Sequence, residues 1–437
     1  MSPAAETGVR LPETGPRERR PALTGGRRSW IVLGATFVSL GMVYGVWYSY
    51  SVFLVAFLKE FGWSRSLVSG AFSLFVIVQG ICSPFIGWLA GRFGPRPLLV
   101  AGGGILGIGL ALTAETTAWW HLYLAFGILT AVGLSSAGWL SSILLIRGWF
   151  PDRVGTALGI ASAGIGIGIT SIVPLTQYLV DLVGWRWTYR ILAALVAGWV
   201  VPASLWLIKN PPAADPPTPA PGRSGQSGAF WTLASAIRSW SFWGLAAVFC
   251  SGNVATQMLL VHQVAYLVDH GVSPLTAAVI AGMVGLVSIP GKIGWGTLSD
   301  RTNRELAYTL AFCCVIASIG LLVLSGSRPA SILPFVYAVF IGLGYAATAP
   351  LTPAAASDVF GGPRFSVIFG TLHVSNAVGA SGGAWIAGWI FDATDSYAAA
   401  LWVALGMAVF SMAVLWIVAP RRPHPPPPES PLKGVDR

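Results

Sequence analysis

The feature that most constrains this chain is a series of twelve apolar stretches, each long enough to cross a lipid bilayer. About 20 apolar residues in a helix span the hydrocarbon core. Of the 437 residues, 54% are hydrophobic and 10% are charged, whereas a soluble domain carries roughly 25% charged residues. We therefore predict an all-α membrane protein with twelve transmembrane helices. The predicted spans are 30–57, 68–91, 97–114, 120–146, 155–181, 188–208, 241–268, 276–297, 306–325, 331–356, 366–391 and 397–418.

The chain divides into two similar halves around a linker rich in Pro, Gly, Ser and Ala. Arg153, Gly159 and Asp181 recur 211 positions later as Arg364, Gly370 and Asp392. Two equivalent six-helix halves, with a cargo site between them near the middle of the bilayer, are typical of transporters. The predicted units are a disordered tail (1–28), a six-helix bundle (29–208), a flexible linker (209–238), a second six-helix bundle (239–419) and a disordered tail (420–437).

The distribution of positive charge predicts the orientation in the membrane. An even number of spans puts both ends of the chain on one side, and that side holds 20 of the 26 Lys and Arg residues. Cytoplasmic segments are enriched in these residues. We therefore expect both termini in the cytoplasm and the protein in the plasma membrane or a bacterial inner membrane. The net charge of +10 is spread over short loops, so it does not indicate a nucleic-acid partner.

Lys292 is the charge that lies well inside a predicted span, in a chain whose 16 acidic residues fall in tails, loops or helix ends. A charge at membrane depth is costly, and it usually serves function. We infer that its missing partner is the cargo, a small organic anion. The alternative is that the lysine side chain extends to the cytoplasmic face near Asp300. The preceding Pro290-Gly291 predicts a distortion of the helix.

Two short segments, beginning at Gly87 and Gly296, resemble the cytoplasmic loop motif G-x-L-a-D-r-x-G-r-r of the major facilitator superfamily. The first segment has Gly91 in place of the acid, and the second keeps it. The resemblance implies the superfamily fold of two six-helix halves, and it assigns a conformational role to the loop residues Gly87, Arg92, Arg153, Asp300, Arg301 and Arg364.

A narrower resemblance is to the monocarboxylate transporter family, which includes oxalate–formate exchangers. The segments that carry it are 57–66, 149–164 and 261–271. Animal members place an Asp and an Arg in helix 8 where this chain has Ser288 and Lys292, and a Lys in helix 1 where it has Tyr48. The exchangers add a Lys in helix 11, aligned with Asn376. The resemblance implies an anion carrier with one embedded cation.

The same superfamily lines its cavity with helices 1, 4, 7 and 10. Aromatic and polar side chains on those spans, with a His and an Asn of helix 11, suit a small carboxylate with an apolar tail. The alternative for each is ordinary helix packing. The predicted substrate-binding residues are Tyr48, Trp139, Asn253, Gln257, Lys292, Tyr345, His373 and Asn376, and the proton-coupling candidates are Lys292, His373 and His262. A gating or packing role is the alternative for His262.

These observations predict a secondary active transporter of small monocarboxylates such as lactate or pyruvate, coupled to protons and working by alternating access. The alternatives are an organic anion exchanger, an efflux carrier for drugs or organic anions, and a non-transporting membrane sensor. No metal cluster, phosphate-binding loop or nucleophile elbow is present in the sequence, so we expect no enzyme activity and no cofactor. The expected partners are the anion, a proton and the bilayer, and the expected state is a monomer.

Overall fold

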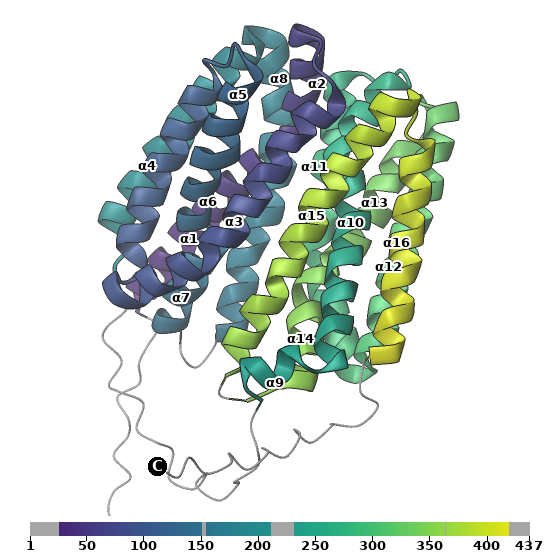
Figure 1. Ribbon diagram of the computed structural model, residues 1–437. Helices are drawn as coiled ribbons and strands as arrows, with labels where there is room; N and C mark the ends of the chain where they lie inside the picture. Colours follow the sequence, from purple (N-terminus) through teal and green to yellow (C-terminus); the bar gives the residue numbers. More distant parts are fainter. Residues whose placement is uncertain (1–25, 151–153, 211–230, 363, 419–437) are drawn as a thin grey trace, which may run out of the picture.

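In the computed structural model, which describes residues 26–150, 154–210, 231–362 and 364–418, all the regular elements are helices (Figure 1). In chain order they are α1 (Arg27–Tyr48), α2 (Tyr50–Phe61), α3 (Arg65–Phe93), α4 (Pro95–Thr113), α5 (Trp119–Leu122), the π-helix η1 (Tyr123–Thr130), α6 (Ala131–Ala137), α7 (Trp139–Trp149), α8 (Val154–Pro202), the π-helix η2 (Ala203–Leu207), α9 (Leu233–Ile237), α10 (Trp240–Asp269), α11 (Pro274–Arg301), α12 (Arg304–Ser327), α13 (Leu333–Ala346), α14 (Thr348–Phe360), α15 (Phe365–Thr394) and α16 (Ala398–Val418).

The twelve predicted spans are confirmed as helices. Ten helical runs are long and apolar enough to cross a membrane, and one of them, Thr156–Leu207, has 52 residues. That run is two helices, because Gly184 has φ 80° and ψ 161°, a conformation that glycine adopts without steric cost. The remaining predicted span, 366–391, is α15, which has 30 residues and is rich in Gly, Ser and Ala.

Three of the spans are interrupted near their middle, which the sequence did not predict. Ser49 separates α1 from α2, Gly138 separates α6 from α7, and Ala347 separates α13 from α14. Gly138 leaves the helical region at φ −89° and ψ −149°, whereas the other two keep nearly helical torsions. By contrast, α11 stays helical through Pro290. The structure therefore has no break in α11 at Pro290, whereas spans 1, 4 and 10 are interrupted.

The helices form two groups, α1–η2 and α10–α16, that lie side by side (Figure 1). They meet where α3 packs on α15 and where α8 packs on α11. Glycines allow these close approaches, since a Cβ on Gly166 would lie 2.6 Å from the carbonyl oxygen of Gly285. We call the groups the N-half and the C-half, and we call the two ends of the molecule the α5 end and the α9 end (Figure 1).

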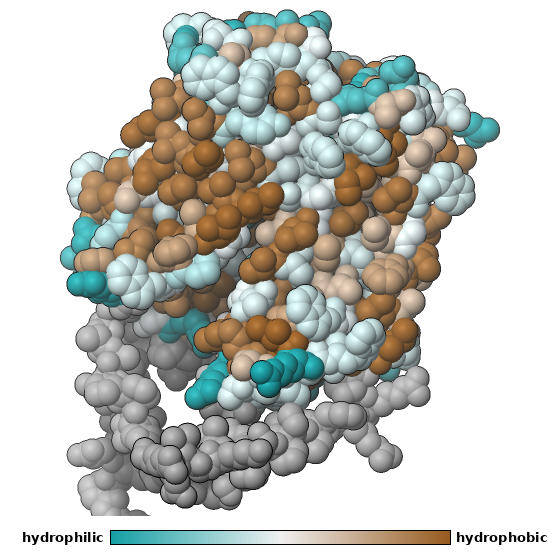
Figure 2. Space-filling model, in the orientation of Figure 1, coloured by the Kyte–Doolittle hydropathy of each residue, from teal (hydrophilic) through white to brown (hydrophobic). Residues whose placement is uncertain are grey.

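The surface and the segment boundaries agree with a protein that spans a membrane. Figure 2 shows apolar residues over the middle of the molecule and hydrophilic residues toward its two ends. Two boundaries differ from the prediction: α1 begins at Arg27, inside the predicted tail 1–28, and α9 forms inside the predicted linker 209–238. A capping box of Thr232 and Ser235 explains α9. Residues 1–25, 211–230 and 419–437 of the predicted tails and linker lie outside the described residues.

Candidate functional site

A row of aromatic rings joins the two halves near the middle of the molecule. Tyr44 stacks on Trp47 at 5.5 Å between ring centroids, and Trp47 stacks on Tyr48 at 6.1 Å. The ring of Tyr345 in α13 meets Tyr48 edge to face at 6.1 Å, and the two hydroxyl groups are hydrogen-bonded. The structure therefore brings together two predicted site residues, Tyr48 and Tyr345, from opposite halves.

Lys292 directly follows a close contact between α11 and α13. Its neighbour Gly291 packs so tightly on α13 that a Cβ there would lie 2.8 Å from the Cβ of Ala346, the residue after Tyr345. The lysine side chain is half-buried, and among the described residues it makes no hydrogen bond or ion pair. Asp300, the acid that the alternative interpretation offered it, binds Arg304 instead. Lys292 is therefore a half-buried lysine within α11 that has no ionic partner among the described residues.

A chain of side-chain hydrogen bonds connects α10 to α15. The amide nitrogen of Asn253 donates to the Oδ1 of Asn376 at 2.6 Å, and the Asn376 amide donates to the Nδ1 of His373 at 2.8 Å. With this amide orientation, His373 accepts at Nδ1 and its neutral form carries the proton at Nε2. Gln257, one turn from Asn253, is buried at 7% exposure. Three predicted residues of the C-half are therefore joined by hydrogen bonds, and the fourth, Gln257, lies one turn away in α10.

Trp139 lies at the break in the fourth span. It begins α7 directly after Gly138, and the Tyr44 hydroxyl lies 3.6 Å from the Cβ position of that glycine. The first N–H groups of a helix have no partner within it and carry partial positive charge. The break therefore places Trp139 and backbone donors beside the aromatic row.

The two halves are joined at the α5 end and separated toward the α9 end. Besides the tyrosine pair, Ser73 donates to the carbonyl of Ser381 at 2.7 Å and Thr170 to that of Gly282 at 3.1 Å. Among the described residues, no hydrogen bond or ion pair between the halves lies farther toward the α9 end than the tyrosine pair. Figure 2 shows a hollow between the halves in that lower region. His373 is exposed on that side of Asn376.

His262 is not part of this central group. It is buried at 2% exposure near the α5 end, where one ring nitrogen contacts the Tyr397 hydroxyl and the other the carbonyl of Ala384, each at 2.9 Å. Both nitrogens are therefore satisfied, which supports the gating or packing interpretation over a free proton carrier. No group of three His, Cys, Asp or Glu side chains in the described ranges is placed to hold a metal ion.

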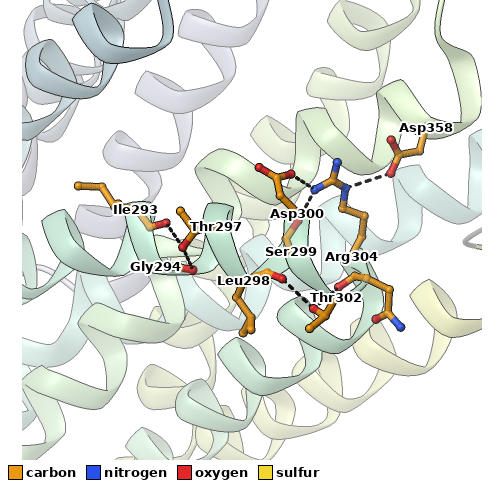
Figure 3. A network of polar contacts seen from close by, with 10 residues as sticks. Ile293, Gly294, Thr297, Leu298, Ser299, Asp300, Thr302, Arg304 and Asp358 are labelled. Atoms are coloured by element: carbon orange, nitrogen blue, oxygen red, sulfur yellow. Dashed lines mark hydrogen bonds and ion pairs between the residues drawn. The ribbon is translucent and has the colours of Figure 1, made fainter.

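The second loop motif forms a charge network within the C-half (Figure 3). The guanidinium of Arg304 binds Asp300 at 2.6 Å and Asp358 at 3.0 Å, which ties the end of α11 to α12 and α14. The sequence identified Asp300 but assigned no role to Arg304 or Asp358. The i, i+4 spacing of Asp300 and Arg304 was a usable signal, whereas Asp358 is distant in sequence and gave none.

The remaining motif residues make weaker contacts. Arg301 and Arg364 are exposed, and Arg364 precedes the first turn of α15. The guanidinium of Arg92 lies over the rings of Trp88 and Phe93 at 5.7 and 5.4 Å, and a Cβ on Gly87 would lie 3.9 Å from Leu140. The first motif therefore has no carboxylate partner among the described residues. Arg153 lies outside them.

Comparison with known proteins agrees with this architecture. The sequence profile of the Major Facilitator Superfamily matches residues 36–341. Monocarboxylate transporter 13 of Rattus norvegicus is 27% identical over 89% of both chains, and monocarboxylate transporter 2 of Homo sapiens is 24% identical over 88% of this chain and 86% of its own. The uncharacterized MFS-type transporter YhjX of Escherichia coli is 25% identical over 81% of this chain and 86% of its own.

Among solved structures, a bacterial homologue of the human lysosomal transporter Spinster, in an inward-facing and occupied conformation, superimposes with a TM-score of 0.69 at 16% identity. The match covers 90% of this chain and 97% of that one. The shared fold, the family profile and the named relatives lead to one conclusion. The chain belongs to the major facilitator superfamily, in the branch that contains the monocarboxylate transporters.

Proposed function

We propose that this transporter carries small monocarboxylates of the lactate and pyruvate type, coupled to protons, by alternating access. The observation that supports this most directly is Lys292, a half-buried lysine within the apolar helix α11 that has no carboxylate partner among the described residues. The relatives named monocarboxylate transporters support the same class of cargo.

The charge and the shape of the site favour a monoanion. One embedded cation balances one negative charge, and a dianion would leave a second charge unpaired at a high desolvation cost. The aromatic row that ends at Tyr48 and Tyr345 offers apolar surface for a short tail. The N–H groups at the start of α7, beside Trp139, supply donors for carboxylate oxygens.

We assign the α9 end to the cytoplasm, because the positively charged loops belong to that end. The α5 end is then the outer end. With the halves joined at the outer end and separated toward the cytoplasm, the structure corresponds to an inward-open state. A rocking motion of the two halves about Lys292 would expose the same site to the outside.

Proton coupling follows from the charge of Lys292. Removing the ammonium from water disfavours its charged form, whereas a bound carboxylate favours it. Anion binding would therefore promote proton uptake, and the pair would cross the membrane without net charge. His373, at the end of the amide chain, is the second candidate for the proton.

The test is transport by purified protein in proteoliposomes. We expect lactate or pyruvate to accumulate when a pH gradient is imposed, and monocarboxylates to compete better than oxalate or succinate. Lys292→Gln removes the attraction between the ammonium and the carboxylate. At contact distance this attraction is worth about 1 kcal/mol in water and about 4 kcal/mol near a protein surface. The affinity for the anion should therefore fall about 5- to 1,000-fold. Lys59→Gln is the matched control, because Lys59 is exposed at the end of α2.

Lys292→Arg separates binding from coupling. Arginine keeps the charge but does not release a proton in proteins, so this variant should bind the anion and fail to accumulate it. Accumulation by the Arg variant in response to pH alone would exclude Lys292 as the proton carrier. Counterflow without accumulation in the wild type would identify an exchanger, and binding without any flux would identify a sensor.

A further inference from the structure

Arg65 is an N-half residue whose side chain is held by the C-half. It begins α3 at the outer end, and its side chain is 12% exposed. Its guanidinium donates to Asp269 at 2.7 Å and to the Tyr397 hydroxyl at 2.6 Å, and it lies 3.7 Å from the ring centroid of Phe391. The side chain of Arg65 is therefore in contact with α10, with α15 and with Tyr397, the residue before the start of α16.

The backbone at the same point is bound by a second C-half acid. The two carboxylate oxygens of Asp392, in α15, accept the backbone N–H groups of Arg65 and Ser66, each at 2.7 Å. These N–H groups lack partners within α3, and a carboxylate at a helix N-terminus is favoured by the helix dipole. The start of α3 is thus tied to the C-half through both its side chain and its backbone.

The contact continues into the buried interior of the C-half. Because the Tyr397 hydroxyl accepts from Arg65, its own proton is free to go to the Nδ1 of His262. The other nitrogen of His262 then donates to the carbonyl of Ala384. This chain fixes the direction of the tyrosine hydroxyl, so His262 positions an acceptor for Arg65.

The internal repeat shows that this arrangement occurs on one side of the molecule only. Asp181 is the N-half equivalent of Asp392, but it accepts a hydrogen bond from Gln177 in its own helix at 2.8 Å. The starts of α3 and α11 are each capped by their own serine, Ser64 and Ser273, but only that of α3 also receives a carboxylate from the other half among the described residues. Arg186, another outer arginine, binds backbone carbonyls within the N-half. Among the described residues, the one ion pair between the halves is therefore that of Arg65 in α3 with Asp269 in α10, beside the contact of α3 with α15.

We propose that Arg65, Asp269 and Asp392 form an outer latch that stabilises the outward-closed state and must open whenever the site faces outward. The latch rests on the alternating access of the proposed function, but not on the identity of the cargo. Four charge-assisted hydrogen bonds and the cation–π contact with Phe391 are lost when the start of α3 separates from the C-half. Arg65 is thus a positioning residue for the conformational cycle, remote from the site at Lys292.

The experiment measures the distance between the two outer ends. Spin labels are attached at Lys59→Cys in the N-half and Ile332→Cys in the C-half, both exposed and near the α5 end, after replacement of the four native cysteines with serine. Double electron–electron resonance in lipid nanodiscs then reports the populations of short and long distances. We expect Arg65→Gln to raise the long-distance population at least tenfold relative to the short one, and Asp269→Asn to raise it by a smaller factor.

Arg186→Gln is the matched control, because it removes an outer arginine whose contacts stay within the N-half. An unchanged distance distribution in both folded Arg65→Gln and Asp269→Asn would overturn the proposal, as would an equal shift in the Arg186 control. The distance measurement needs no substrate. A protein that transports no monocarboxylate but shows the predicted shift would therefore refute the proposed cargo and support the latch.

Discussion

Gly388 is the position at which one added methyl group should change the balance between the inward-open and outward-open states. It lies in α15 against the start of α3, where a Cβ would meet the Oγ of Ser69 at 2.6 Å and the backbone carbon and oxygen of Arg65 at 2.8 Å. The serine side chain can rotate away, but the backbone of Arg65 cannot. Gly388→Ala therefore forces α3 and α15 apart at the outer end.

The size of the effect follows from the cost of overpacking, about 1–3 kcal/mol for an extra group in a well-packed interface. Alanine also gains up to about 1 kcal/mol over glycine in helix propensity, but that gain is present in both conformations and cancels. The clash exists only when the outer end is closed. The ratio of closed to open molecules should therefore fall about 5- to 140-fold.

The assay is the spin-label distance between Lys59→Cys and Ile332→Cys. Gly370→Ala is the matched control, because Gly370 lies in the same helix and a Cβ there would meet no atom within 4 Å. We expect a long-distance population in Gly388→Ala and none beyond the wild-type level in the control. If both variants give the wild-type distribution, the outer contact of α15 with α3 does not limit the opening of the protein.

Three further variants test the packing, the aromatic row and the loop motif. Gly168→Ala would drive a Cβ into the carbonyl oxygen of Gly41, so we expect the free energy of unfolding to fall by about 3 kcal/mol or more, with a lower melting temperature. Gly198→Ala is the control, because a Cβ there would meet no atom within 4 Å. Tyr345→Phe removes the hydrogen bond to Tyr48, which is worth about 0.5–1.5 kcal/mol. The ratio of the long-distance to the short-distance spin-label population should therefore change about 2- to 12-fold. Tyr308→Phe is the control, because it removes a hydrogen bond within the C-half and should leave this ratio unchanged. Asp300→Asn should change the transport rate less than about fivefold, because the carboxylate is 72% exposed and exposed ion pairs contribute about 0–1 kcal/mol; a complete loss of transport would contradict this.

The helices were predictable from the sequence because membrane spans are long and depend mainly on apolar length. Apolar length also separated the predicted spans 155–181 and 188–208, and the turn at Gly184 lies between them. The breaks at Ser49, Gly138 and Ala347 were not predicted, because a break costs little where neighbouring helices or a cavity satisfy the freed backbone groups. Their positions are set by tertiary contacts, such as that of Tyr44 with Gly138.

The chemistry of the site was easier to predict than its connections. Charge patterning identified Lys292, and helical spacing with the family's cavity-lining helices identified Tyr48 and Tyr345, which the structure pairs. The sequence did not identify the outer network around Arg65. The acids of this network, Asp269 and Asp392, lie at the ends of predicted spans, where charged residues are common. Their positions in the sequence therefore did not indicate a contact with Arg65, which is seen only in the folded chain.

The two ends of the protein differ in whether their ion pairs join the two halves. This difference suggests that the substrate itself helps to bring the halves together at the end that lacks such a pair. At the α5 end Arg65 binds Asp269 across the halves, whereas at the α9 end the network of Asp300, Arg304 and Asp358 stays within the C-half. Ionic contacts between the described residues therefore hold the two halves together at the α5 end and not at the α9 end. A carboxylate bound to Lys292 that also contacts the N-half near Trp139 would supply the missing link between the halves. Because a ligand shifts an equilibrium only through its differential affinity for the two states, we expect the cargo itself to drive closure of the cytoplasmic side.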